Sequence, residues 1–268
     1  MLGGVSLSIG SILNISRKYS QAISDLSAIT GASIERMKEY SIASQELGRT
    51  TEFGAIKVAD AMKLIASAKP SLLQTAGALE DVTAKSITLA QASGIELADA
   101  AKSLTLSLNQ FGESAVSSER YINVLAAGAK YGASEINETA QAIVKSGTVA
   151  SQAGVSFEQL NASIQVLAGK GIKAEVAGTM LRNVLLALER SADKNLRPSV
   201  VGLATALENL DKKNYSTTAS TKIFGRANVS AGTILVKNRD QLVDLTKALT
   251  DTETAYEQAG KTSAKSKC

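Results

Sequence analysis

The sequence predicts an all-α protein, a compact array of short helices and helical hairpins joined by glycine-containing turns. Apolar residues recur along the chain at steps of three and four, the spacing of one helix face. Proline, which breaks helices, occurs only at Pro70 and Pro198. Aromatic residues, which strands favour, make up only 4% of the 268 residues, whereas the hydrophobic content of 44% is enough to bury a core.

Glycine and threonine mark the ends of the first expected helices. A helix over residues 34–47 is stopped by Gly48. Thr50 or Thr51 caps the next helix, because a threonine hydroxyl can accept a hydrogen bond from a free backbone N–H. That second helix runs to Pro70. Its buried face carries Val58, Met62 and Ile65.

The clearest helical pattern follows the turn at Ser93 and Gly94. Five apolar residues recur at steps of four, three, four and three, which places them on one face of a helix that Gly112 ends. They are Leu97, Ala101, Leu104, Leu108 and Phe111. Further units are expected over 72–91, 116–130, 134–146, 156–168, 174–191, 199–210 and 239–258, the last carrying Leu242, Leu245 and Leu249.

Short similar segments point to a repeat. VADAM (58–62), LADAA (97–101) and TAQAI (139–143) each follow a capped helix start, and SFEQLNASI (156–164) is a looser version. Such self-similarity is typical of stacked helical hairpins, although short alanine-rich helices also resemble one another through composition alone.

One segment, GIKAEVAGTMLRNVLLALE (171–189), shows what these helices are for. It has no reactive side chain that could act on a substrate, and Ala177, Leu181, Val184 and Leu188 share one face. We expect the helix to lock one hairpin onto the next. Gly171 and Gly178 are expected to permit close backbone approach, and Leu185 and Leu188 to fill the core.

The expected organisation has five parts. They are a helical lead-in over 1–24, a helical core domain over 25–210, an exposed loop over 211–222, a C-terminal helical part of the core over 223–258 and a flexible basic tail over 259–268. The loop is expected because DKKNYSTTAS (211–220) is dense in polar and β-branched residues. The tail is expected to be solvated because of its lysines.

The net charge of +4 comes from the two ends of the chain. Arg17 and Lys18 precede the first acidic residue, and three lysines follow the last one, Glu257. Without these five residues the chain has 24 basic and 25 acidic side chains. This balance argues against a nucleic-acid face over the whole domain, which would need clustered Lys and Arg.

The composition excludes most enzyme chemistry. There is no histidine, and Cys268 is the single cysteine, so a disulfide within the chain, a His-containing zinc site and a Ser-His or Cys-His pair are all impossible. Glu80 and Asp81 are adjacent on a helix, so their carboxylates diverge. We therefore expect no enzyme and no catalytic, metal or cofactor-binding residues. The cysteine count indicates a reducing compartment or leaves the compartment undecided.

Two other motifs are rejected on context. AYEQAGKT (255–262) fits a relaxed phosphate-binding loop through Gly260, Lys261 and Thr262, but a polar helix precedes it where a buried strand is needed, and Ala255 replaces the first glycine. The opening MLGGVSLSIGSILNI lacks the leading positive charge of a secretory signal and is too rich in Gly and Ser to span a bilayer.

Four blocks in order give the chain a resemblance to a known family. They are AITGASIERMKEYSIASQELGRTTEFGAIKVADAMKLIASA, LADAAKSLTLSLNQFG, AGVSFEQLNASIQVLAGKGIKAEVAGTMLRNVLLAL and KIFGRANVSAGTILVKNRDQLVDLTKAL, together spanning roughly 25–258. The ordered set resembles the core region of TP901-type phage tail tape measure proteins of the minor tail. Members usually carry long helical extensions, so we expect a fragment or a short member.

The resemblance implies a structural protein of a phage or phage-like tail that sets tail length during assembly and leaves ahead of the DNA at ejection. It implies a place in the virion tail lumen, and in the host cytoplasm during assembly. Implied partners are tail tube subunits, tail tip proteins, tail assembly chaperones, further copies of the chain, and transient membrane or DNA contacts. Two alternatives stay open, a self-associating helical scaffold or adaptor unrelated to tails and a membrane-inserting helical channel component.

Overall fold

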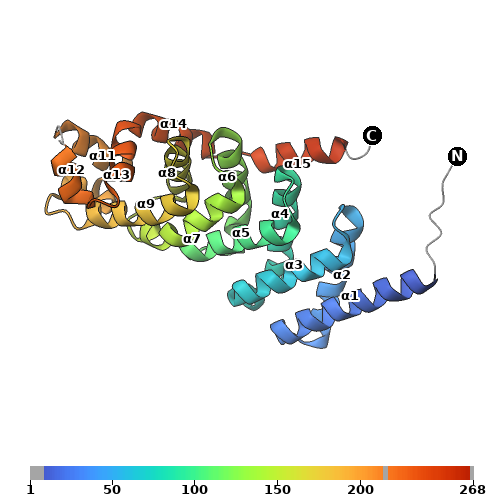
Figure 1. The fold of residues 1–268 in the computed structure, drawn as a ribbon. Coiled ribbons are helices and arrows are strands. Elements are labelled where there is room, and N and C mark those ends of the chain that lie inside the picture. The colour runs from blue at the N-terminus through green and yellow to red at the C-terminus, as the bar shows by residue number, and fades with distance from the viewer. Residues whose placement is uncertain (1–8, 214–216, 266–268) are drawn as a thin grey trace.

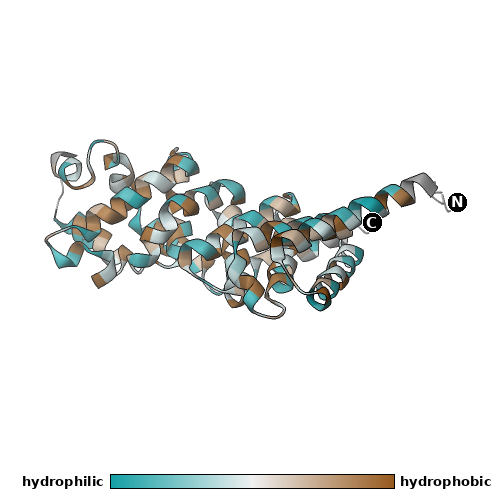
Figure 2. Cartoon of the chain, turned by 90° about the horizontal axis from the view of Figure 1, so that it is seen from below, coloured by the Kyte–Doolittle hydropathy of each residue, from teal (hydrophilic) through white to brown (hydrophobic). Residues whose placement is uncertain are grey.

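The structure is a computed structural model that describes residues 9–213 and 217–265 (Figure 1). All regular elements in these two ranges are helices, which confirms the all-α prediction. The longest is α1 (Ile9–Thr30), with 22 residues, so the chain is an array of short helices and not a rod. Apolar and polar residues alternate around most helices (Figure 2), as amphipathic packing requires.

Four helical hairpins form the body of the molecule. Successive hairpins stack side by side, so that α1, α3, α5, α7 and α9 make one layer and α2, α4, α6 and α8 make a second. The hairpins are α2 (Ile34–Thr50) with α3 (Gly54–Ala68), α4 (Ala78–Ser93) with α5 (Leu97–Phe111), α6 (Ser118–Tyr131) with α7 (Ile136–Gln152), and α8 (Phe157–Gly169) with α9 (Ala174–Glu189). Short 3-10 turns, η1 (Pro70–Gln74) and η2 (Ala115–Ser117), connect some of them.

A ladder of ion pairs repeats along the second layer. Glu80, Glu119 and Glu158 lie 39 residues apart, each in the first turn of its helix. Each meets a cation of the preceding helix in that layer, and the pairs are Arg36–Glu80, Lys85–Glu119 and Arg120–Glu158. The predicted repeat is therefore real in space. VADAM, LADAA and TAQAI lie in α3, α5 and α7 of the same layer, whereas SFEQLNASI forms α8 of the other.

The C-terminal third closes the stack and then returns along it. One group of short elements packs against α8, α9 and one another at the far end: η3 (Lys194–Leu196), α10 (Pro198–Val201), α11 (Leu203–Lys212), α12 (Thr217–Phe224) and α13 (Val229–Lys237). Next, α14 (Arg239–Leu249) lies on α8 and α6, and α15 (Thr254–Lys265) lies on α6 and α4. These two helices, red in Figure 1, form a third layer over the second.

The core confirms several predicted contacts. Val58, Met62 and Ile65 are fully buried, and so are Leu185 and Leu188. Helix α5 has the predicted bounds, with Gly112 in a left-handed conformation at its end. A trio of rings lies in the middle of the stack, with Tyr121 and Phe157 stacked at 3.9 Å between centroids and Phe111 edge-on to both.

Two of three glycine predictions need correction. Gly48 does not stop a helix, because α2 continues through it to Thr50. A Cβ atom at Gly48 would lie 2.2 Å from the backbone nitrogen of Ala55, so this glycine lets α2 approach the start of α3. Gly178 meets the expectation, since its Cβ would lie 2.5 Å from the carbonyl oxygen of Ala142 on α7. Gly171 does not, because open space surrounds it and its φ of 85° is what requires glycine there.

Other boundaries differ for local reasons. The N-cap position of α3 is Phe53, which offers no side-chain cap, and neither Thr50 nor Thr51 caps that helix. Gly202, with φ of 80°, divides the helix expected over 199–210, and the turn around Asp251, with φ of 51°, divides the one over 239–258. The unit expected over 72–91 begins inside η1, six residues before α4, and the one over 134–146 ends six residues before α7 does. The other expected helices have bounds within three residues of the observed ones.

The predicted loop and tail are largely helical. Asp211 and Lys212 end α11, and 217–222 belong to α12, while 214–216 lie outside the described residues. The basic tail over 259–265 continues α15, because Ala255 and Ala259 are buried against α4 and α6. Helix α1 likewise crosses the expected boundary at residue 24, and residues 1–8 and 266–268, with Cys268, lie outside the described part.

Candidate functional site

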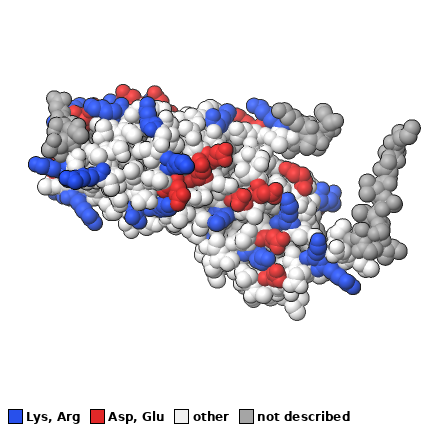
Figure 3. All heavy atoms as spheres, in the orientation of Figure 1, with Lys and Arg blue, Asp and Glu red and all other residues white. Residues whose placement is uncertain are grey.

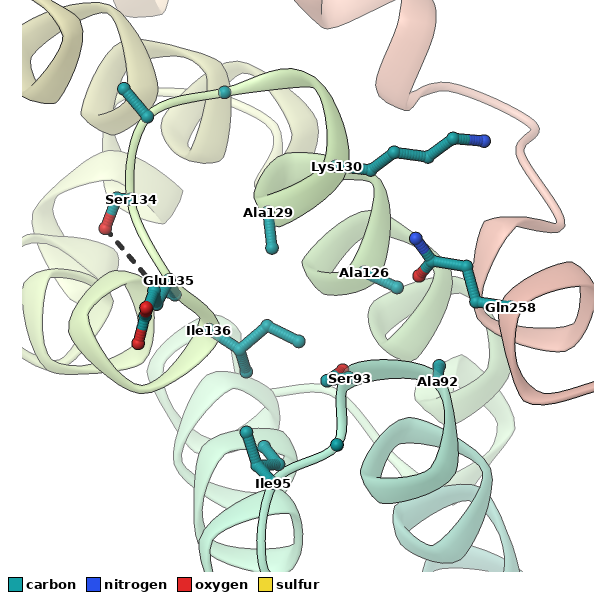
Figure 4. Close-up of a pocket in the computed structure, with 13 residues that line it drawn as sticks. Ala92, Ser93, Ile95, Ala126, Ala129, Lys130, Ser134, Glu135, Ile136 and Gln258 are labelled. Carbon is teal, nitrogen blue, oxygen red and sulfur yellow. Dashed lines mark hydrogen bonds between the residues drawn. The ribbon is translucent and has the colours of Figure 1, made fainter. Parts of the chain in front are cut away.

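A hollow of about 650 Å³ opens between the α4–α5 turn, the α6–α7 turn and α15 (Figure 4). Its two charged residues, Lys130 and Glu135, extend to opposite sides, so they form no acid–base pair. Lys130 Nζ lies 3.7 Å from Glu257 Oε2 on α15. Small side chains make up most of the rest of the lining: Ala92, Ser93, Gly94, Ala126, Ala129, Gly132, Ala133 and Ser134. Such a hollow can accept a packed polypeptide segment, and it offers little for chemistry.

A buried amide network holds one wall of this hollow. Gln165 Oε1 accepts hydrogen bonds from the backbone nitrogens of Ala133 and Ser134, at 2.8 and 2.7 Å. Its amide nitrogen donates to Thr139 Oγ1 at 3.0 Å and to Asn161 Oδ1 at 3.2 Å. Because all its polar atoms are satisfied, the network fixes the α6–α7 turn on α8 instead of weakening the core.

Two glycines make room for that network. A Cβ atom at Gly128 would lie 2.5 Å from Asn161 Oδ1, and one at Gly132 would lie 2.2 Å from Gln165 Oε1. Asn161 also donates to the carbonyl of Val124 at 3.1 Å, so α6 and α8 are joined along their length. The sequence shows these residues only as polar positions on helices. The signal that could have found them is the spacing of two amide side chains, Asn161 and Gln165, four residues apart on one helix.

Helix α15 is fastened to the stack by polar contacts. The N–H of Ala255 at its start donates to Asn123 Oδ1 of α6 at 2.9 Å, across 132 residues of chain. Lys85 Nζ of α4 donates to Tyr256 Oη at 2.5 Å and to Glu119 at 2.7 Å. Burial lowers the pKa of Lys85, but these two bonds outweigh it and hold the pKa above its ordinary value. Asn123, Lys85 and Tyr256 therefore help to hold α15 on α4 and α6.

A bidentate ion pair between α6 and α8 lies beside the returning helices α14 and α15. Arg120 Nε and Nη2 donate to the two oxygens of Glu158 at 2.6 and 2.7 Å, and Glu158 is only 5% exposed. Burial raises the pKa of Glu158, but the hydrogen bonds from Arg120 outweigh it, so the pKa lies below the ordinary value. Nearby, burial raises the pKa of Tyr121, whose hydroxyl has no partner among the described residues. Both groups are held in fixed charge states at neutral pH.

The N-terminal end of the stack, formed by α1, α2 and α3, has exposed apolar surface. A hollow of about 720 Å³ lies where α1 meets the start of α3, lined by Ile15, Tyr19, Phe53 and Ile56 among others. Ile15 is half exposed, and other large aliphatic side chains of α1 and α2 are exposed as well: Leu13, Ile29, Ile34 and Ile42. Exposed apolar surface beside such a hollow is typical of a surface that contacts other proteins.

The residues considered for chemistry do not come together. Glu80 pairs with Arg36 at 3.4 Å, while Asp81 is exposed. Gly260, Lys261 and Thr262 lie inside α15, so the segment is no phosphate loop. Within 9–213 and 217–265, no cluster of acidic residues or cysteine is arranged to hold a metal ion, and no helix has the length and hydropathy to cross a bilayer.

The fold and these surfaces define a class of protein, a stacked-hairpin scaffold whose conspicuous features are packing and contact faces. A family model described as phage-related minor tail protein matches residues 41–267. The chain therefore belongs to the phage-related minor tail protein family. Neither the curated proteins nor the solved structures contain a significant match. The match supports a role as a structural component of a phage tail and begins after α1, so the first helix lies outside it.

Proposed function

We propose that this chain is the core region of a tail tape measure protein, which acts in tail assembly, length determination and genome ejection. The observation that carries the proposal is a folded-back helical stack in a chain of the minor tail family. The ordered sequence blocks that resemble TP901-type tape measure proteins support the finer assignment. A structural role also agrees with surfaces that offer contacts in place of paired catalytic groups.

Within that function the stack acts as an assembly domain and not as the measuring arm. A helix of 22 residues, the longest here, spans only about 33 Å at ~1.5 Å per residue. The chain then reverses at every hairpin and returns in α14 and α15, so its reach grows little with its length. Length measurement requires extended helix, which this segment does not supply.

The proposed partners are tail tube subunits, tail tip proteins, tail assembly chaperones and further copies of the chain. The proposed locations are the host cytoplasm during assembly and the lumen of the finished tail. The exposed aliphatic residues of α1 and α2 support contact with such partners, because burying large apolar side chains favours association.

Electron microscopy of tails made by a phage with altered copies of this gene tests the proposal. We expect deletion of the codons for 41–265 to abolish tails, because assembly loses its core. Insertion of 40 helical residues after Lys265 should lengthen tails by about 60 Å, from ~1.5 Å per residue. Tails of unchanged length in both mutants would contradict the tape measure assignment and favour a helical adaptor that associates through the α1 and α2 faces.

A further inference from the structure

The charge of the molecule is segregated along the stack. Residues 174–237, which run from the start of α9 to the end of α13, hold 9 Lys or Arg and 5 Asp or Glu, whereas the rest of the chain holds 20 and 20. Basic side chains gather at that end of the face drawn in Figure 3, while acidic ones lie mainly over the middle. The near-neutral balance of the whole chain conceals this difference.

A cationic hollow lies at the basic end. It measures about 560 Å³ and opens between the C-terminal half of α9 and the segment that joins α12 to α13. Arg190 and Lys222 line it from the two sides. Arg226 lies next to the lining residue Gly225, and Arg197 Nε donates to the carbonyl of Ser191, another lining residue, at 2.8 Å. Two cations therefore line the hollow, and two more belong to residues that adjoin or bond its lining.

These cations are not neutralised by the chain. In the described residues, Arg190, Lys222 and Arg226 have no carboxylate partner, and no acidic residue lines the hollow. The five acidic side chains of this end are all engaged elsewhere. They bond as follows: Glu175 with Lys145, Glu189 with Ser199, Asp193 with Lys213, Glu208 with Lys212 and Asp211 with Lys237.

We propose that this basic hollow binds the phosphate backbone of a nucleic-acid duplex. Arginine guanidinium groups present planar pairs of donors that match phosphate oxygens. Asn183 and Asn228, which also line the hollow, are bonded to each other, so the cations are its main donors. Release of counterions from the duplex drives such binding without any acidic protein surface. The inference rests on charge and shape alone and does not require the proposed role in tail length.

The lining favours duplex over single strands, and backbone over bases. Single-strand sites use exposed aromatic rings on which bases stack. The one aromatic ring in the lining, Phe224, is 4% exposed and packs against Gly232. Contacts to phosphates carry no sequence information, so two duplexes of different sequence should bind equally.

Fluorescence anisotropy with a labelled 24-base-pair DNA duplex tests the inference on the intact chain. Four phosphate contacts predict a slope of about −3.6 in log affinity against log salt, which is a fall of about 150-fold between 50 and 200 mM NaCl. The triple variant Arg190→Gln, Lys222→Gln, Arg226→Gln should bind at least tenfold more weakly at 50 mM, with a slope near −0.9 for the remaining contact.

The matched control removes two arginines and one lysine from the other end, as Arg17→Gln, Lys18→Gln, Arg49→Gln. It should bind the duplex within about twofold of the unaltered chain, and circular dichroism should show both triples fully helical. An equal loss in both triples, or no binding at 50 mM, would overturn the inference. Tighter binding of labelled polyglutamate than of the duplex at 50 mM NaCl would overturn it in favour of an acidic protein partner.

Discussion

Helices α8 and α2 occupy the same layer of the stack but differ greatly in burial. In α8, 10 of 13 residues are buried, whereas in α2 only Tyr40 and Ser44 are buried among 17 residues. The cause is their neighbours. Helix α8 contacts α6, α7, α9, α13 and α14, while α2 packs mainly on α3 and lies beyond the reach of the returning α14 and α15. We call the helices from α6 to α9, where α14 covers α6 and α8, the locked middle. We call α1 and α2, which α14 and α15 do not cover, the open end.

The return of α14 and α15 over the second layer, more than helix propensity, therefore sets where the molecule is rigid. The open end keeps aliphatic residues in solvent, with Ile34 at 86% exposure and Ile42 at 59%. In the middle, polar groups as well as apolar ones are enclosed, including Glu158, Asn161 and Gln165. We expect substitutions in the two regions to have effects of very different size.

The largest effect is expected from Leu185→Asp in the locked middle. Leu185 is fully buried in α9, and an aspartate there would be a charge without a partner, so the domain should unfold or disassemble, with a loss of about 4 kcal/mol or more. Leu13→Asp on α1, where the side chain is 54% exposed, should change the free energy of unfolding by less than about 0.5 kcal/mol. Urea denaturation measures both, and equal losses would remove the distinction between the regions.

Two glycine substitutions should have opposite effects on stability, because one glycine is enclosed and the other is not. Gly178→Ala places a Cβ atom 2.5 Å from the carbonyl oxygen of Ala142, a backbone atom that cannot rotate away, and should cost about 1–3 kcal/mol. Gly260→Ala, inside α15 with open space around it, should stabilise by up to about 1 kcal/mol through helix propensity. Thermal unfolding gives both signs, and a destabilising Gly260→Ala would mean that α15 packs more tightly than described.

A smaller effect is expected where α15 is fastened. Asn123→Ala removes the acceptor of the Ala255 N–H, leaves that donor buried, and should cost about 1–2 kcal/mol. The loss should be local, with faster hydrogen exchange in α15 than in α9. Asn14→Ala, at an exposed position on α1, serves as the control and should leave the exchange of α15 unchanged. Unchanged exchange of α15 in Asn123→Ala would show that this bond does not hold α15 on α6.

The smallest effect concerns pH and the Arg120–Glu158 pair. The pKa of Glu158 is lower in the folded state than in the unfolded chain, so the folded state binds fewer protons near the ordinary value of about 4.3. The pair therefore contributes stability above that value and loses it as pH falls through the folded pKa. Urea midpoints from pH 7 to 3 should fall less steeply for Glu158→Gln than for the unaltered chain. Parallel profiles would show that the pair adds no pH dependence.

The sequence predicts the local helices well because their signals are local. The five apolar residues of 97–111 and the glycine that follows contain all that is needed to place α5. The error at Gly48 arose because glycine both ends helices and permits close packing inside them, and only the approach of Ala55 distinguishes the two. The loop expected over 211–222 was wrong where it is described, because contacts of α11 and α12 outweigh their weak propensity.

The surface on which α15 packs could not be predicted from the sequence, because it depends on contacts between residues far apart in the chain. The Asn123–Ala255 bond joins positions 132 residues apart, and no periodicity signals it. The basic hollow was hidden for a different reason. Its cations are scattered from Arg190 to Arg226, and a charge sum over the whole body averages them with acidic residues at the other end. The 39-residue spacing of Glu80, Glu119 and Glu158 was readable, and it could have established the repeat.

Hydrogen exchange of the unaltered chain, followed by mass spectrometry, tests most directly the claim that the returning helices divide a locked middle from an open end. The amides of α6 and α8, which lie beneath α14 and α15, should exchange only through global unfolding. Those of α1 and α2 should exchange at least a hundredfold faster, as roughly 2.7 kcal/mol less protection requires. Equal protection of α2 and α8, or exchange of α6 as fast as that of α2, would contradict it.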